Sequence, residues 1–85
     1  SGERVVERVC QEVGVRVEEL QGGGRRTVVS RARAGIAYLW VEWLGRSGST
    51  IARVVGVHPA TIYEIARRGQ QEASYWQQLG ATLKP

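Results

Sequence analysis

The stretch "IARVVGVHPATIYEIARRG", residues 51–69, holds two short runs with helical apolar spacing on either side of a glycine. The apolar positions that would pack two such helices together are Ile51, Val55, Ile62 and Ile65. Small Ala52 lets the helices approach, Gly56 permits the positive φ of a sharp turn, and Pro59 suits the first position of the second helix. The pattern predicts a helix-turn-helix over residues 49–68, which would place its second helix in a DNA major groove; a plain helical hairpin is the alternative.

The second helix of this pair is expected to keep a polar side exposed. Its members are His58, Ala60, Thr61, Glu64, Arg67 and Arg68. In a major groove, Ala60 and Thr61 would touch thymine methyl groups, and Glu64 would accept from cytosine N4. His58 would donate to a guanine or a phosphate. The alternatives are that His58 caps its own helix, that Glu64 pairs with Arg68 one turn on, and that Tyr63 packs.

The flanking sequence predicts further helices and no strand. Thr27 is expected to cap the longest helix, and Ser47 or Ser49 the helix that starts the pair. Eighty-five residues suffice for one domain. We therefore expect a single all-α domain, residues 1–85, built as a compact bundle of about five to six helices. Its segments are a helix at 3–13 ended by Gly14, a helical turn at 17–20, a basic loop at 21–27, a long helix at 28–44, the helix-turn-helix and a C-terminal helical tail at 70–85.

The amino-acid composition argues against a catalytic site and against a bound metal or cofactor. The chain has one His, one Cys and no Asp, whereas metal sites and catalytic triads need several converging ligands or bases. Cys10 lies among valines and is expected in the core. Trp40 and Trp43, one turn apart, are expected there too rather than on a base-stacking surface. The glycines at 22–24 lack the lysine and hydroxyl of a phosphate-binding P-loop and predict an ordinary loop.

Hydropathy indicates a soluble protein. No apolar run approaches the roughly 20 residues of a membrane span, and no signal-peptide pattern opens the sequence. We therefore expect a cytoplasmic, nucleoid-associated location. No heptad pattern indicates an oligomer.

Charge is distributed unevenly along the chain. Residues 1–22 carry three arginines and five glutamates, a net charge of −2, whereas the remainder carries nine basic and three acidic side chains, a net charge of +6. Eleven of the twelve basic residues are arginine, which pairs with phosphates and guanine edges through two parallel hydrogen bonds. This balance indicates nucleic acid as the partner.

The segment "GGGRRTVVSRAR" places Arg25, Arg26, Arg31 and Arg33 around the start of the long helix, with no acid among them. A helix N-terminus disfavours cations, so an external anion such as a DNA phosphate would stabilise this arrangement. Arg25 or Arg26 would follow the loop toward the minor groove, while Arg31, Arg33, Arg67 and Arg68 would grip phosphates. The alternative is a solvated basic end paired with Glu42 or with the acidic first helix.

Together, "GRRTVVSRARAGIAYLWVEWLG" and "STIARVVGVHPATIYEIARR" resemble the C-terminal DNA-binding domain of the bacterial replication initiator DnaA, over about residues 3–69. Similar domains occur at the C-termini of some transposases associated with repetitive elements, so a larger parent polypeptide is possible. The resemblance implies a Trp-repressor-like fold and a double-stranded DNA partner, read by the loop in one groove and by the recognition helix in the other. Residues 58–61 read His-Pro-Ala-Thr where the initiator has Asp-His-Thr-Thr, so its origin-box specificity is not implied.

Two other functions fit the same sequence. A helical protein-interaction module would dock an acidic partner through its arginines, or a partner helix through Tyr75, Trp76 and Leu79. An RNA-binding domain is the third reading, and the lack of exposed aromatic platforms favours a duplex over single-stranded RNA.

Overall fold

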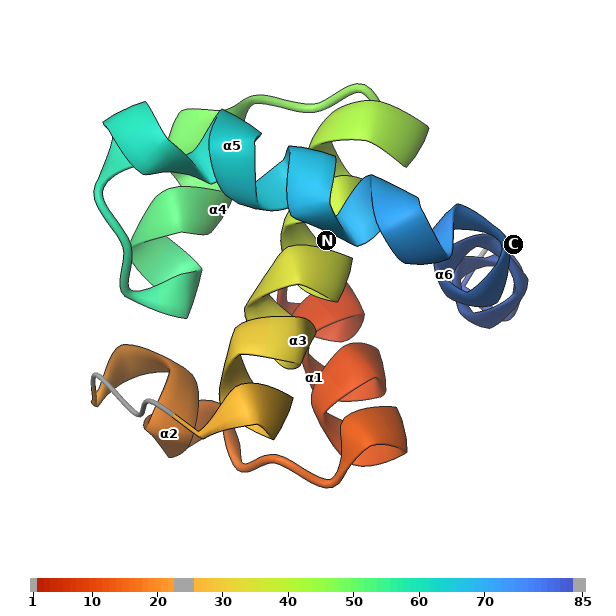
Figure 1. Cartoon of the computed structure of the whole chain (residues 1–85), viewed down its shortest axis with the longest axis horizontal. Coiled ribbons are helices and arrows are strands. Elements are labelled where there is room, and N and C mark those ends of the chain that lie inside the picture. Colours follow the sequence, from red (N-terminus) through yellow and green to blue (C-terminus); the bar gives the residue numbers. More distant parts are fainter. Residues whose placement is uncertain (1, 23–25, 84–85) are drawn as a thin grey trace.

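The chain folds into helices that surround one central helix, as the computed structural model of residues 2–22 and 26–83 shows (Figure 1). Every regular element in these ranges is helical, which confirms the all-α prediction. The Cα radius of gyration is 11.1 Å, typical of a compact domain of this length. In chain order the elements are α1 (Gly2–Val13), α2 (Val17–Gln21), α3 (Thr27–Ala37), the π-helix η1 (Tyr38–Trp43), α4 (Gly48–Val55), the 3-10 turn η2 (Pro59–Thr61), α5 (Ile62–Gly69), the 3-10 turn η3 (Gln70–Glu72) and α6 (Ala73–Ala81).

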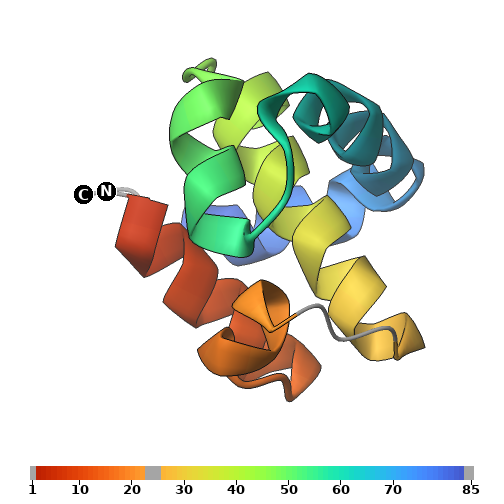
Figure 2. The ribbon, with the colours of Figure 1, turned by 90° about the vertical axis from the view of Figure 1, so that its left-hand side faces the viewer.

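Helix α3 is the central element and packs against α1, α2, α4 and α5 (Figures 1 and 2). The prediction that Thr27 caps it is wrong. Arg26 holds the N-cap position with an extended backbone, and its carbonyl accepts the N–H groups of Val29 and Ser30 at 3.0 and 3.1 Å. Thr27 is the first residue of the helix itself, so its hydroxyl does not occupy the N-cap position.

The second half of the predicted long helix winds as the π-helix η1. The N–H of Leu44 donates to the carbonyl of Leu39, five residues back, at 2.9 Å. Trp40 lies in the core, as predicted, and its indole N–H donates to the carbonyl of Ser47 at 2.8 Å. Trp43 is half-buried against the same core. The wider turn was not predicted, because the apolar spacing of residues 36–43 also fits an ordinary α-helix.

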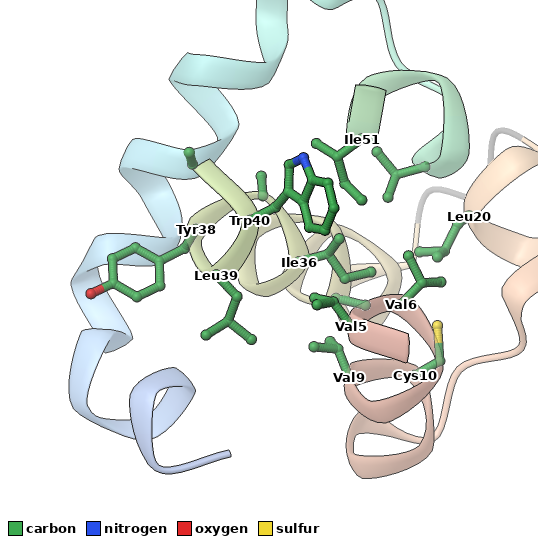
Figure 3. Packing of buried hydrophobic residues seen from close by; sticks show 14 of the residues in the cluster. Val5, Val6, Val9, Cys10, Leu20, Ile36, Tyr38, Leu39, Trp40 and Ile51 are labelled. Atoms are coloured by element: carbon green, nitrogen blue, oxygen red, sulfur yellow. The ribbon is translucent and has the colours of Figure 1, made fainter. Parts of the chain in front are cut away.

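The core joins the inner sides of all the larger helices (Figure 3). Cys10 of α1 is buried there, as predicted, and burial raises the pKa of its thiol. Trp76 of α6 is fully buried, and Leu79 is nearly so. These two side chains therefore present no surface to a partner helix, which corrects the expectation that they form a docking site. No helix in the described ranges is both long enough and apolar enough to cross a membrane.

Two glycines allow helices to cross at close range. A Cβ added to Gly69 of α5 would lie 2.3 Å from the carbonyl oxygen of Ala34 in α3. A Cβ on Gly35 would lie 2.6 Å from the Trp76 ring. The chain continues from Gly69 into η3 with right-handed helical backbone, so this glycine serves the crossing of α3 and α5 rather than a chain break.

Candidate nucleic-acid interface

The two helices predicted at 49–68 form as α4 and as η2 with α5, joined by a turn at Gly56. Gly56 has φ +72°, the left-handed conformation that the sequence predicted for it. A Cβ there would also lie 2.9 Å from Cα of Gln21 in α2. The Gln21 side chain in turn donates to the carbonyl of Val54 at 3.0 Å. Helix α2 therefore packs against the turn between α4 and η2, and this contact helps to set the position of the second helix in space.

The start of α4 is capped from α5. Ser47 holds the N-cap position, one of the two predicted, but its hydroxyl makes no cap hydrogen bond. The N–H of Gly48 instead donates to the Tyr63 hydroxyl at 3.2 Å, and a Cβ on Gly48 would lie 2.9 Å from the Tyr63 ring. Tyr63 thus packs against α4, as one of the alternatives expected, and this contact sets the α4–α5 geometry.

His58 caps the second helix of the pair. Its Nδ1 accepts the N–H of Ala60 at 3.0 Å, with Pro59 at the first helical position as predicted. An accepting Nδ1 in a neutral imidazole assigns the proton to Nε2. The cap alternative is therefore confirmed, and Nε2–H of this exposed residue is left as a donor.

Thr61 is tied into the same cap. Its backbone N–H and its hydroxyl both donate to the carbonyl of His58, at 3.0 and 2.9 Å. With its donor engaged, the exposed Thr61 side chain offers a ligand its methyl group and the acceptor side of its hydroxyl.

The predicted outward side of the second helix, formed by η2 and α5 with their N-cap residue, is exposed along its length, and Ile62 and Ala66 are buried on the opposite side. The exposed residues are His58, Ala60, Thr61, Glu64, Arg67 and Arg68. Glu64 and Arg68 do not form the ion pair offered as an alternative. On this side the Glu64 carboxylate and the guanidinium groups of Arg67 and Arg68 have no partner among the described residues.

Arg67 and Arg68 share this property with Arg53 of α4. Within residues 2–22 and 26–83, none of the three makes an ion pair or a hydrogen bond through its side chain. Sequence reasoning about the helix pair missed Arg53, although it is the only charged residue of α4. We call Arg53, Arg67 and Arg68 the α4–α5 arginines.

The arginines near the start of α3 are engaged differently. Arg26 forms an ion pair with Glu19 of α2, rather than with Glu42 or α1. The pKa of Glu19 is lowered, first by the backbone N–H of Arg16, which donates at 3.1 Å, and then by Arg26. Arg25 lies outside the described residues.

Arg31 is held by Glu72 of η3 in a two-pronged ion pair. Its Nη2 and Nε donate to the two carboxylate oxygens at 2.7 and 2.9 Å. The guanidinium also lies 4.9 Å from the Tyr75 ring centre and 5.3 Å from that of Trp76. Hydrogen bonding to Arg31 lowers the pKa of Glu72, and the same contact raises the pKa of Arg31. Glu72 therefore occupies the Nε–Nη2 edge of Arg31 and competes with any phosphate for it.

Arg33 completes the group that we call the α3 arginines: Arg26, Arg31 and Arg33. Its Nη2 donates to the carbonyl of Leu20 at 2.7 Å, and the side chain is half-buried. It borders a small hollow between α3 and α5, lined by Ser30, Arg33, Ala34, Val57, Ile65 and Arg68. Of the arginines predicted as phosphate contacts, the structure brings Arg33 and Arg68 to one place and directs Arg31 elsewhere.

Comparison with known proteins adds no relative. No family model, no curated protein and no solved structure matches the chain significantly. Among the described residues, no group of His, Cys, Asp and Glu is arranged to hold a metal ion.

Proposed function

We propose that this domain binds double-stranded DNA, with α4 and α5 acting as a helix-turn-helix of the kind found in Trp-repressor-like domains. One observation carries the proposal: the exposed side of α5 offers base-reading groups, while the α4–α5 arginines beside it lack partners in the described chain. Clustered cations attract a polyanion, and a single helix fits the roughly 12 Å width of a major groove.

The cap at the start of α5 assigns the reading groups their chemistry. The methyl groups of Ala60 and Thr61 would contact thymine methyl groups. The Thr61 hydroxyl already donates its hydrogen to the His58 carbonyl, so it has no further hydrogen to donate to a base. His58 would donate from Nε2 to a guanine acceptor or to a phosphate. Glu64, which has no partner among the described residues, would accept from cytosine N4.

The remaining predicted contacts would set position rather than read sequence. Arg67 and Arg68 would bind phosphates on either side of the groove, with Arg53 reaching the backbone from α4. Arg26, whose side chain is 60% exposed, would approach the minor groove together with Arg25. In this proposal the domain has no catalytic role and serves a replication, transposition or transcription protein.

The test is to incubate the domain with a library of random duplex DNA at near-physiological salt and to sequence the retained fraction. An enriched short motif would support base reading. Retention without enrichment would reduce the function to phosphate binding, and absence of retention would favour a module that docks an acidic protein. With about five phosphate contacts, affinity should fall by between about four and five orders of magnitude over a tenfold rise in salt.

A change at Thr61 tests the reading role with the cap left intact. Thr61→Ser keeps the hydroxyl that bonds His58 and removes only the methyl. We expect roughly three- to tenfold weaker binding to the enriched motif and no loss of affinity for unrelated duplexes, because an apolar base contact is lost. Equal weakening on all duplexes would contradict a reading role for this residue.

A further inference from the structure

The hollow between α3 and α5 combines groups that suit one anion. It is lined by two arginines from different helices, Arg33 and Arg68, and by the hydroxyl-bearing Ser30. The other lining residues, Ala34, Val57 and Ile65, are apolar. Every polar side chain that lines this hollow can therefore donate a hydrogen bond, and the rest of its lining is apolar.

The Arg33 guanidinium is held in a fixed orientation at the hollow by contacts within the chain. One edge of its guanidinium is fixed by the 2.7 Å bond from Nη2 to the carbonyl of Leu20. Leu20 is itself fully buried, so this acceptor belongs to a rigid part of the molecule. Because a guanidinium carries five N–H donors, Arg33 can keep its contacts within the chain and bind an anion at the same time. Little side-chain entropy then remains to be lost on binding.

The helix crossing brings Arg68 to the same place. Gly69 follows Arg68 in the chain and approaches the carbonyl of Ala34 too closely to carry a side chain. Ala34 follows Arg33 in α3 and also lines the hollow. The crossing of α3 and α5 at these two small residues thus sets the spacing between the two arginines, although they lie far apart in sequence.

We propose that the hollow is the site of a single DNA backbone phosphate, held jointly by Arg33 and Arg68, with Ser30 donating a further hydrogen bond. The apolar lining residues Val57 and Ile65 would contact the adjoining deoxyribose, which favours a phosphodiester over free phosphate. This site rests on the proposed function, because it borders the exposed side of α5. It goes beyond that function by assigning two arginines to one phosphate.

A double-substitution experiment distinguishes one shared phosphate from two separate ones. Binding to the enriched duplex is measured across a salt series for the unchanged domain, Arg33→Gln, Arg68→Gln and the double variant. We expect each single variant to bind about tenfold more weakly, and the double variant to fall well short of the hundredfold product, because residues sharing a partner are not additive. The double variant should lose about 0.9 from the slope of log affinity against log salt, one phosphate's share.

Arg53 provides the matched control. It is exposed and lies on α4, outside the residues that line the hollow. The effects of Arg53→Gln and Arg68→Gln should therefore multiply, and their double variant should lose about 1.8 from the slope, two phosphates' share. If Arg33 and Arg68 behave in the same multiplicative way while the unchanged domain still binds DNA, the shared site is refuted and the proposed function stands. If the unchanged domain binds no duplex, the proposed function fails first.

Ser30→Ala separates binding from folding. Ser30 is exposed, and its hydroxyl makes no side-chain hydrogen bond in the described part of the chain. Its loss should leave the melting temperature unchanged while weakening duplex binding about two- to fivefold; unchanged binding would remove Ser30 from the site. Inorganic phosphate alone, followed by amide NMR shifts at residues 30, 33 and 68, should bind only at tens of millimolar. Submillimolar binding would overturn the assignment to a phosphodiester.

Discussion

The α3 arginines and the α4–α5 arginines are two groups of equal size in contrasting surroundings. Successive helical residues turn by about 100°, so Arg26, Arg31 and Arg33 point to three different neighbours. These neighbours are the Glu19 carboxylate, the Glu72 carboxylate and the Leu20 carbonyl. The α4–α5 arginines have no such partner in the described residues. A dense run of charge in sequence is therefore not a dense patch in space, and the cations open to an external anion lie mainly on α4 and α5.

The contrast depends on α5 staying against α3, and Gly69→Ala would disrupt that contact most strongly. The added Cβ would meet the Ala34 carbonyl, a backbone atom that cannot turn away. We expect a loss of about 2–3 kcal/mol in the free energy of unfolding, the upper part of the usual range for an overpacked core, measured by urea denaturation. Melting should fall by roughly 10 °C or more.

Gly2→Ala is the control for this substitution. Gly2 lies at the start of α1, and its added Cβ would make only ordinary contacts of 3.4 Å with Ile51 and Trp40. Its stability should stay the same or rise slightly, because alanine favours helix. A Gly69→Ala variant as stable as Gly2→Ala would mean that the crossing does not require glycine.

The next prediction compares one arginine from each group. Arg67→Ala should weaken duplex binding about tenfold, or about 1.4 kcal/mol, because Arg67 has no internal partner in the described chain to compete with a phosphate. Arg31→Ala should weaken it by no more than about twofold and should instead lower stability, since it breaks the contact with Glu72. Affinity by fluorescence anisotropy and melting by circular dichroism separate the two effects. A larger affinity loss at Arg31 than at Arg67 would show that Arg31 contacts a phosphate despite its bond to Glu72.

The predictability of the two groups from sequence differs for a physical reason. The exposure of α5 follows from helical periodicity, and Gly56 and Pro59 are constrained by local backbone geometry, so all of these were correctly predicted. The partner of Arg31 lies 41 positions away in η3, and no local rule connects the two residues. Long-range ion pairs depend on how the helices pack, which the spacing of apolar residues does not specify.

The hollow was hidden for the same reason. It depends on the crossing at Gly69, and glycines in a sequence are more readily interpreted as chain breaks than as contact points. Tyr63 was considered only as a packing residue, whereas its hydroxyl also accepts the first N–H of α4. The sequence offers only weak evidence for this hydrogen bond, because Tyr63 is simply an aromatic residue next to the exposed side of a helix.

Glu72→Gln gives the smallest expected effect on stability and bears directly on the contrast. The pKa of Glu72 is lower in the folded state because Arg31 bonds to the ionised carboxylate. This contribution to stability is therefore present above the unfolded pKa of about 4.3 and is lost as pH falls through the lower folded pKa. The pair is well exposed, at 37% and 41% of the two side chains, so its removal should cost less than about 1 kcal/mol at pH 7.

Melting and duplex binding measured across pH check this expectation. The Glu72→Gln variant should melt with a weaker dependence on pH between about 5 and 3 than the unchanged domain. The control, Glu42→Gln, changes an exposed position without an ion pair in the described chain and should retain that dependence. Because a neutral amide in place of the Glu72 carboxylate would compete less with a phosphate for Arg31, duplex binding should rise by up to about twofold. A rise of tenfold or more would show that Glu72 prevents a strong contact between Arg31 and a DNA phosphate. The α3 arginines and the α4–α5 arginines would then differ only in the internal partners that the chain provides.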